Sequence, residues 1–196
     1  MRYCPSDRYF LNCFNQKSIY MKIYPLFIVS FFNSLLFFGQ EINIPGNTDF
    51  NSKDRIAIND VIDAYGFYWD SNDLESFLSL FSDDAIGVTI NTRNEKDKYL
   101  IKSVNQVNDY KKRMEYFEKN QMQRRHMMAN TLFISMDSNY AHIKKYMTLL
   151  TTNKKEKTEI VTPISYVFKL EKINSIWKIV YREINLDKQI DLPLIK

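Results

Sequence analysis

Four long stretches rich in β-branched and aromatic residues occupy the second half of the chain, and they constrain its fold more than any other feature. Short polar breaks at residues 137–139, 153–157 and 173–175 separate them. Val, Ile, Thr, Tyr and Phe favour extended backbone, and short polar breaks between such stretches are typical of hairpins. The pattern therefore predicts an antiparallel meander of four strands, at residues 124–136, 140–152, 158–172 and 176–187.

Helical periodicity dominates the part of the chain that precedes this meander. At residues 53–70, apolar side chains recur every three to four positions and form one stripe, which predicts an amphipathic helix. The stripe consists of Ile58, Val61, Ile62, Tyr65, Tyr68 and Trp69. Further helices are predicted at 73–81 and 104–117, and short strands at 85–91 and 98–103.

Helices gathered before a run of hairpins indicate an α+β fold in which the helices cover one face of a sheet. The composition agrees, because 45% hydrophobic and 26% charged residues are ordinary globular values and exclude a disordered or collagen-like chain. With only 4 glycines in the sequence, a P-loop or a Gly-rich dinucleotide turn is disfavoured, since both need clustered glycines.

The first forty residues differ from the rest of the chain in charge and in cysteine content. They hold both cysteines, Cys4 and Cys13, so cysteine chemistry is not expected from residue 41 onward. The later part carries 23 basic and 22 acidic groups, a balance that gives no support to a nucleic-acid-binding surface.

Residues 24–38 form an apolar run that follows Lys22 and ends before Gly39. A membrane span needs about 20 residues, and a shorter run behind a lysine is typical of a secretory signal. We therefore expect export to the periplasm or the medium, without a stable membrane span after cleavage. A buried or membrane-anchoring helix is the alternative interpretation.

The position of this run suggests how the chain is organised. If translation starts at Met21, residues 21–40 make a signal peptide of ordinary length, and residues 1–20 are a non-native or extended N-terminus. Residues 41–52 then form a linker, the domain extends over 53–187, and residues 188–196 are a C-terminal tail.

Three segments of the sequence resemble the nuclear transport factor 2-like superfamily, in particular its SnoaL-like polyketide-cyclase branch. Residues 65–85, which read YGFYWDSNDLESFLSLFSDDA, are similar to the opening helix pair of that family. Residues 125–130, RHMMAN, resemble its Arg-His-x-x-x-Asn strand, and residues 176–179, IWKI, resemble its closing strand. The resemblance covers about residues 53–187.

The resemblance implies a cystatin-like α+β barrel, in which a strongly curved antiparallel sheet forms a cone around N-terminal helices. Such a cone encloses a mostly apolar pocket that suits a small hydrophobic molecule. Members of the superfamily include dehydratases, isomerases, cyclases and epoxide hydrolases as well as non-catalytic binding or dimerisation modules, and homodimers are common among them. The fold therefore does not decide the function.

His126 is the first candidate for chemistry. Strand alternation places it on one face with Met128, Asn130, Leu132 and Ile134, which is apolar except for His126 and Asn130. An imidazole among apolar neighbours is suited to general acid–base catalysis, although a hydrogen-bonded structural histidine is the alternative. Relatives of the scytalone-dehydratase type carry a pocket histidine at this strand position, so the resemblance favours the catalytic interpretation.

Asp70 is the natural partner of His126, because the resemblance implies an aromatic–Asp pair here that Trp69 and Asp70 would form. The helical stripe alone does not direct Asp70 inward, since successive residues differ by about 100° around a helix. A carboxylate that caps the following loop is the alternative. Tyr65, one turn before Trp69, could offer its hydroxyl to the pocket or simply pack in the core.

Lys145 is an anomaly on the more apolar face of its strand, which it shares with Ala141, Ile143, Met147 and Leu149. It could bind an anionic or carbonyl group of a ligand, or extend outward to solvent. Dehydratases of the family have a second pocket histidine near this position, so the resemblance does not extend to full catalytic equivalence. The other histidine, His142, is expected on the opposite face, at the surface.

Metal binding is not predicted, because the two histidines fall on opposite strand faces and the sequence has no zinc or calcium motif. The short charge runs at 124–125 and 154–157 are expected at a strand edge and in a solvated hairpin.

Three functions remain open from the sequence. One is a cofactor-free acid–base enzyme of the dehydratase, isomerase, cyclase or hydrolase type. It would use His126 and Asp70, with Tyr65, Asn130 or Lys145 polarising an oxygen. The second is a non-catalytic ligand-binding or dimerisation module. The third is a structural surface protein that assembles through its sheet, with Tyr140, Tyr146 and Tyr166 over a dimer face.

Overall fold

Three helices and six strands make up the part of the chain that the computed structural model describes, residue 45 and residues 51–190. Their order confirms the predicted α+β class. The elements are α2 (Ser52–Asp70), α3 (Leu74–Ser79), β1 (Phe81–Ile90), β2 (Lys96–Leu100), α4 (Val104–Lys119), β3 (Gln123–Met136), β4 (Tyr140–Thr152), β5 (Thr158–Ile173) and β6 (Ile176–Leu186). The predicted N-terminal extension, signal peptide and most of the linker and tail lie outside the described residues.

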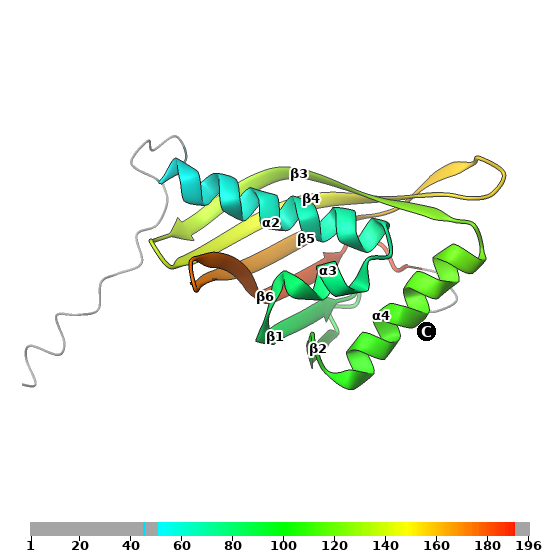
Figure 1. Ribbon diagram of the computed structural model, residues 1–196. Coiled ribbons are helices and arrows are strands. Elements are labelled where there is room, and N and C mark those ends of the chain that lie inside the picture. The colour runs from blue at the N-terminus through cyan, green and yellow to red at the C-terminus, as the bar shows by residue number, and fades with distance from the viewer. Residues whose placement is uncertain (1–44, 46–50, 191–196) are drawn as a thin grey trace, which may run out of the picture. The chain divides into compact units, whose positions relative to one another are not determined.

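The six strands form one sheet in the order β2-β1-β6-β5-β4-β3 (Figure 1). Strands β3 to β6 make the predicted antiparallel meander. One pair differs from the expected antiparallel sheet, because β1 runs parallel to β6. The meander ends on β6, so the first and last strands of the domain become neighbours.

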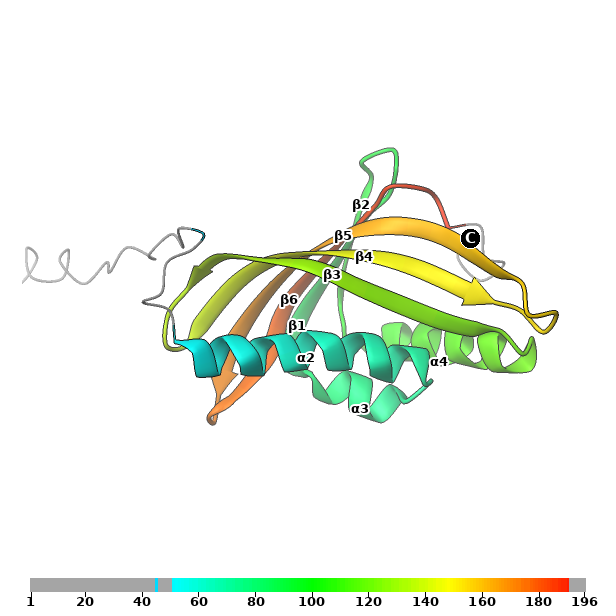
Figure 2. The same ribbon diagram turned by 90° about the horizontal axis from the view of Figure 1, so that it is seen from above.

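All three helices lie on the same side of the sheet, and the strands bend over them (Figure 2). The pairing register shifts at points within β3–β4, β4–β5, β5–β6 and β1–β6. Such β-bulges bend a strand and increase its twist, which lets long strands curve over the helices. The predicted curved sheet around N-terminal helices is thus confirmed.

The core lies between the concave face of the sheet and the helices. Helix α2 contributes the inward side of its predicted stripe, and the sheet contributes aromatic and aliphatic residues from β4, β5 and β6. The fully buried side chains include Ile58, Ile62, Phe77, Ile143, Phe168, Leu170 and Ile179. Each of the three helices in the described part of the chain is too short or too polar to span a bilayer.

The boundaries of β1 and β2 differ from the predicted strands. Strand β1 begins at Phe81 because this residue pairs with Ile179, whereas the polar residues 82–84, expected as a turn, lie in the register break before Ile86. Strand β2 lies at Lys96–Leu100 rather than 98–103, since it pairs directly with the end of β1.

An acidic anchor fixes the N-terminal end of α2 to the sheet. The Asp54 carboxylate accepts hydrogen bonds from the Trp177 indole at 2.8 Å and from the Lys172 ammonium at 2.7 Å, and its side chain is only 12% exposed. Burial acts to raise the pKa of Asp54, but these two donors outweigh it and hold the pKa below its ordinary value. The charged form is therefore the one that the fold stabilises.

We predict that Asp54→Asn lowers the free energy of unfolding at pH 7 by about 1–3 kcal/mol, because a buried charge-assisted network loses its acceptor. The folded-state pKa of Asp54 is depressed, so its stabilisation is present at neutral pH and is lost as the pH falls below about 4. Urea unfolding of the wild type and of Asp54→Asn should show a difference in the free energy of unfolding that becomes smaller at acidic pH. Asp60→Asn, at an exposed position on the same helix, is the control.

Candidate functional site

A cavity of about 430 Å³ lies between the helices and the concave face of the sheet. Every helix and strand described above contributes to its wall. Aromatic residues of α2, α3 and α4 form much of the lining, and apolar residues of β4, β5 and β6 complete it. The volume falls within the range of small-molecule sites, roughly 300–1,000 Å³, so a compact ligand could be enclosed here.

His126 of β3 and Asp70 at the end of α2 are brought together at the edge of this cavity. The imidazole Nδ1 lies 2.6 Å from Asp70 Oδ1, and the backbone N–H of His126 donates to Asp70 Oδ2 at 2.7 Å. Their side chains are 6% and 10% exposed. Because Asp70 is the last residue of its helix, its carboxylate can reach back to β3, which the helical stripe alone could not indicate.

This pairing decides how the imidazole can act. An ionised carboxylate only accepts hydrogen bonds, so the proton of the neutral ring lies on Nδ1 and the lone pair lies on Nε2. His126 lines the cavity, and no group among the described residues hydrogen-bonds to Nε2. Asp70 lines a second hollow, with Phe67 and Met127, and His126 borders both spaces. The Asp70 carboxylate therefore holds the ring through Nδ1, and Nε2 remains available to accept a proton.

Gly66 allows α2 to approach β3 closely at this point. A Cβ atom added to Gly66 would lie 3.3 Å from the Cβ of His126 and 3.8 Å from the Cγ of Met128. Any larger residue would therefore press against His126. The absence of a side chain at position 66 sets the separation between the helix and the strand that hold the pair.

Tyr65 and Trp69 both line the cavity. The Tyr65 ring meets the His126 ring edge to face, with centroids 6.5 Å apart. Trp69 packs against Phe77 and Tyr110. These two residues give the cavity an aromatic wall beside the imidazole.

Asn130 does not face the cavity, and the predicted alternation of β3 is wrong from this residue onward. Asn130 is exposed and has a positive φ of 50°, at the point where the pairing with β4 skips from Ala129 to Leu132. This bulge reverses the faces of the strand, so Phe133 is buried while Leu132 is exposed. Asparagine tolerates positive φ better than most residues, which accounts for its place in the bulge.

Lys145 points inward as its strand face predicts, but it is not among the residues that line the cavity. Its ammonium donates to Asp63 Oδ1 of α2 at 2.7 Å. The cost of burying this charge is thus offset by an ion pair with the helix. The structure therefore places Lys145 as a link between α2 and β4.

Arg124 is buried, although its charge run was expected at a strand edge. β3 is indeed an edge strand, but the Arg124 side chain turns inward and is only 2% exposed. Its guanidinium lies between the rings of Trp69 and Phe117 and donates to the Trp69 carbonyl at the end of α2. Burial lowers the pKa of Arg124 to about 10. The aromatic partners and the carbonyl at the end of the helix explain why this cation is tolerated inside.

Arg182 of β6 is a second buried cation in the wall, and sequence reasoning did not identify it. It donates to the hydroxyls of Tyr65, Tyr99 and Tyr110. In the β5–β6 pairing the register shifts between Lys169 and Leu170, where β6 skips from Tyr181 to Ile179. The buried positions of β6 therefore change from Trp177 and Ile179 to Arg182. Simple alternation from Trp177 places Arg182 outside, so only the bulge brings it into the cavity.

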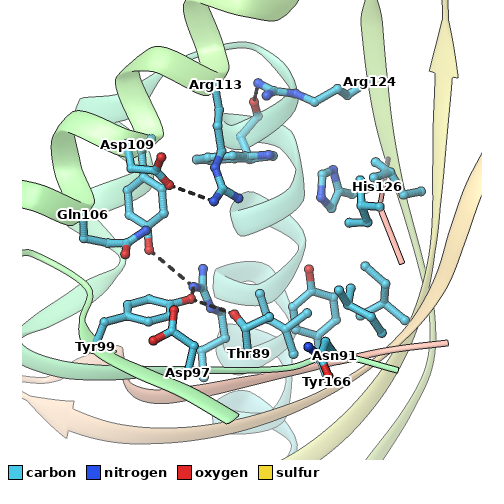
Figure 3. Close-up of a pocket in the computed structure, with 18 of the residues that line it drawn as sticks. Thr89, Asn91, Asp97, Tyr99, Gln106, Asp109, Arg113, Arg124, His126 and Tyr166 are labelled. Carbon is cyan, nitrogen blue, oxygen red and sulfur yellow. Dashed lines mark hydrogen bonds and ion pairs between the residues drawn. The ribbon is translucent and has the colours of Figure 1, made fainter. Parts of the chain in front are cut away.

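Arg113 of α4 extends into the cavity, where it pairs with Asp109 at 2.8 Å; His126 lies on the opposite wall (Figure 3).

Within residues 45 and 51–190, no three His, Cys, Asp or Glu side chains gather into a cluster that could hold a metal ion. The described walls therefore offer one imidazole, several guanidinium groups and several phenols, with the carboxylates of Glu95, Asp97 and Asp109 and the ammonium of Lys96 on the β2 and α4 side.

A family model described as the SnoaL-like domain matches residues 51–183. No curated protein matches the chain. Solved structures share its fold. The chain superposes on a protein from Novosphingobium aromaticivorans, assigned as the β subunit of an aromatic-ring-hydroxylating dioxygenase, with a TM-score of 0.60 and 18% identity. The match covers 74% of this chain and 95% of that one.

Two further structures extend this likeness. A protein from the same organism, assigned as a scytalone dehydratase, has a TM-score of 0.54 and 20% identity, over 71% of this chain and 88% of its own. A protein from Catenulispora acidiphila, solved in complex with S-DNPA, has a TM-score of 0.55 and 13% identity. The match covers 70% of this chain and 96% of that one. At these identities the likeness establishes the cystatin-like fold alone.

We predict that neutral His126 carries its proton on Nδ1 and that Asp70→Asn moves this proton to Nε2. The side-chain carbonyl of the substituted amide would keep the bond from the His126 backbone N–H, so its NH₂ group would donate to Nδ1 and move the ring proton to Nε2. Long-range ¹H–¹⁵N correlation spectra of the neutral ring distinguish the two tautomers. The His142 signals serve as the internal control, and an Nε2–H tautomer in the unmodified protein would contradict the assignment.

Proposed function

The chain belongs to the SnoaL-like domain family, and on this premise we propose that it binds a small molecule in the cavity and performs cofactor-independent acid–base chemistry with His126. The observation that carries the proposal is the bond between His126 Nδ1 and Asp70 Oδ1, which leaves Nε2 at the cavity wall. The reaction class is proton transfer at a carbon or oxygen of the ligand, as in dehydration, isomerisation, cyclisation or hydrolysis.

In the proposed mechanism, His126 Nε2 accepts a proton from the bound molecule and becomes an imidazolium. Asp70, hydrogen-bonded to Nδ1, stabilises the positive charge as it forms and keeps the ring in position. The imidazolium then returns the proton to another atom of the ligand or to the leaving group. The aromatic rings of Tyr65 and Trp69 form the cavity wall beside the imidazole, and such apolar neighbours favour proton transfer to the ligand over transfer to water.

A non-catalytic binding module is the second candidate, and the extent of the aromatic lining favours it. Tyr65, Phe77 and Tyr166 would supply binding area whether or not His126 reacts. The two candidates differ in one measurable respect, because only the enzyme exchanges protons with its ligand.

We predict that ligands found by thermal-shift screening of carbonyl compounds exchange an acidic C–H for deuterium in the presence of the protein. His126→Gln should lower the exchange rate by about 10²–10⁴-fold, because the general base is removed. Mass spectrometry of the ligand after incubation in D₂O measures the rate. His142→Gln, on the opposite face of the sheet, is the matched control and should keep the wild-type rate. Unchanged exchange in His126→Gln would reject the proposed role, and binding without exchange would favour the binding module.

We also propose that the protein is exported, because residues 24–38 have the composition of a signal-peptide core. After expression of the full chain in a bacterial host, we predict that it leaves the cytoplasm with a new N-terminus close to Gly39 or Gln40. Cell fractionation and mass spectrometry of the intact protein provide the measurement. A cytoplasmic product that retains residues 21–40 would contradict the proposal.

A further inference from the structure

The guanidinium of Arg182 is a buried positive charge without a carboxylate partner. The residue is only 3% exposed, and it lines the cavity. Among the described residues, its hydrogen-bond partners are the hydroxyls of Tyr65, Tyr99 and Tyr110, at 3.2, 2.6 and 3.3 Å. No Asp or Glu in that part of the chain forms an ion pair with it. A buried cation is costly unless it is paired, so this arrangement calls for an explanation.

The surrounding phenols do not neutralise this charge, because they keep their protons. Burial raises the pKa of Tyr110 to about 12 and that of Tyr166 well above its ordinary value. Burial acts to lower the pKa of Arg182, but the oxygens of Tyr65 and Tyr110 more than offset this and keep the group protonated. At neutral pH the cluster therefore carries one net positive charge.

The cluster also has more hydrogen-bond donors than acceptors. Each tyrosine oxygen that accepts from Arg182 still has an O–H to donate. Tyr65 donates to the Tyr166 oxygen at 3.4 Å, and Tyr99 shares a bond with Thr89 at 3.1 Å. The protons of Tyr110 and Tyr166 find no acceptor among the described residues, and neither does the buried Nε of Arg182. Three donors of this cluster are therefore unsatisfied. Elsewhere in the lining, Arg113 Nε and two guanidinium nitrogens of Arg124 are also buried without a partner.

The other charges at the cavity do not supply the missing acceptor. Arg113 already pairs with Asp109. Glu95 and Asp97 are exposed at the β1–β2 end of the lining, where water screens them. Arg124 is the other buried cation of the lining, but it lies near the Asp70 carboxylate and donates to the Trp69 carbonyl and to Asn72 Oδ1. Arg182, between the Tyr65 ring and the phenols of β2 and α4, therefore carries a charge that no nearby carboxylate of the described residues balances.

We propose that the cavity recognises a compact molecule with an apolar body and one carboxylate, and that Arg182 with its tyrosines holds this carboxylate. The carboxylate would accept the free O–H groups of Tyr110 and Tyr166 and would neutralise the guanidinium behind them. Charge-assisted bonds of this kind are the strongest that neutral phenols can make. The inference rests on the proposed small-molecule pocket and adds its substrate class.

The position of the cluster fits an acid that also reaches His126. Tyr65 lies between the two groups, with its ring 6.5 Å from the His126 ring and 5.8 Å from the Arg182 guanidinium carbon. A carboxylate at the phenols would therefore leave the apolar body of the ligand beside the imidazole. Arg182 would fix the orientation of the ligand, and His126 would act on the body.

Calorimetric titration of the full chain with benzoate, 2-naphthoate and 4-biphenylcarboxylate tests the proposal, with the three corresponding amides as neutral isosteres. We predict that at least one acid binds and that its amide binds at least about tenfold more weakly, because a hydrogen bond to a charged group is lost. Equal binding of acid and amide would overturn the carboxylate inference while the small-molecule pocket stands. An absence of binding by all six compounds would also overturn the inference.

Variants distinguish recognition by this cluster from general attraction of anions. Arg182→Gln should lower the affinity for the acid at least about tenfold and leave the affinity for the amide unchanged. Tyr110→Phe keeps the charge and removes one O–H, so it tests the same site even if Arg182→Gln fails to fold. Arg93→Gln removes an exposed cation of the β1–β2 turn and is the control for net charge. Acid binding that is unchanged in Tyr110→Phe, or lowered equally in Arg93→Gln, would contradict the proposal.

Discussion

Two carboxylates at opposite ends of α2 fasten this helix to the concave face of the sheet, and the cavity depends on them. Asp54 binds Trp177 of β6 and Lys172 of β5, whereas Asp70 binds His126 of β3. The helix is thus tied to both the middle and the edge of the sheet, and the space between these ties and α4 remains open. One of the ties is also the candidate catalytic pair, so stability and chemistry share a contact.

Much of the fold could be predicted because it follows from local pattern. The hairpin breaks and the apolar stripe of α2 are visible in the sequence, and the alternation of β4 correctly turns Lys145 inward. The pairing of β1 with β6 could not be predicted, since no local feature encodes which distant strands become neighbours. The burial of Arg124 was missed for a similar reason: its aromatic partners, Trp69 and Phe117, come from two different helices.

The errors about the site arise from β-bulges. Alternation assumes an unbroken strand, and one extra residue exchanges its two faces. The bulge at Asn130 moved that residue out of the cavity wall, and the register shift between Lys169 and Leu170 brought Arg182 into it. Asn130 adopts the positive φ of the bulge. An asparagine in the sequence is only a weak indication of such a bulge, because asparagine is also common in ordinary turns. His126 was placed correctly because it precedes the first bulge.

The strand order has a consequence for how the domain is made. β6 lies between β1 and β5, yet it is the last strand to leave the ribosome. Until it emerges, the β1–β2 hairpin has no neighbour in the sheet, and the meander has an open edge. Contacts between sequence-distant segments of this kind slow folding and prolong exposure of unpaired edges. The buried guanidinium arrives on that same strand, so the nascent chain completes its sheet and encloses its charge in a single late event.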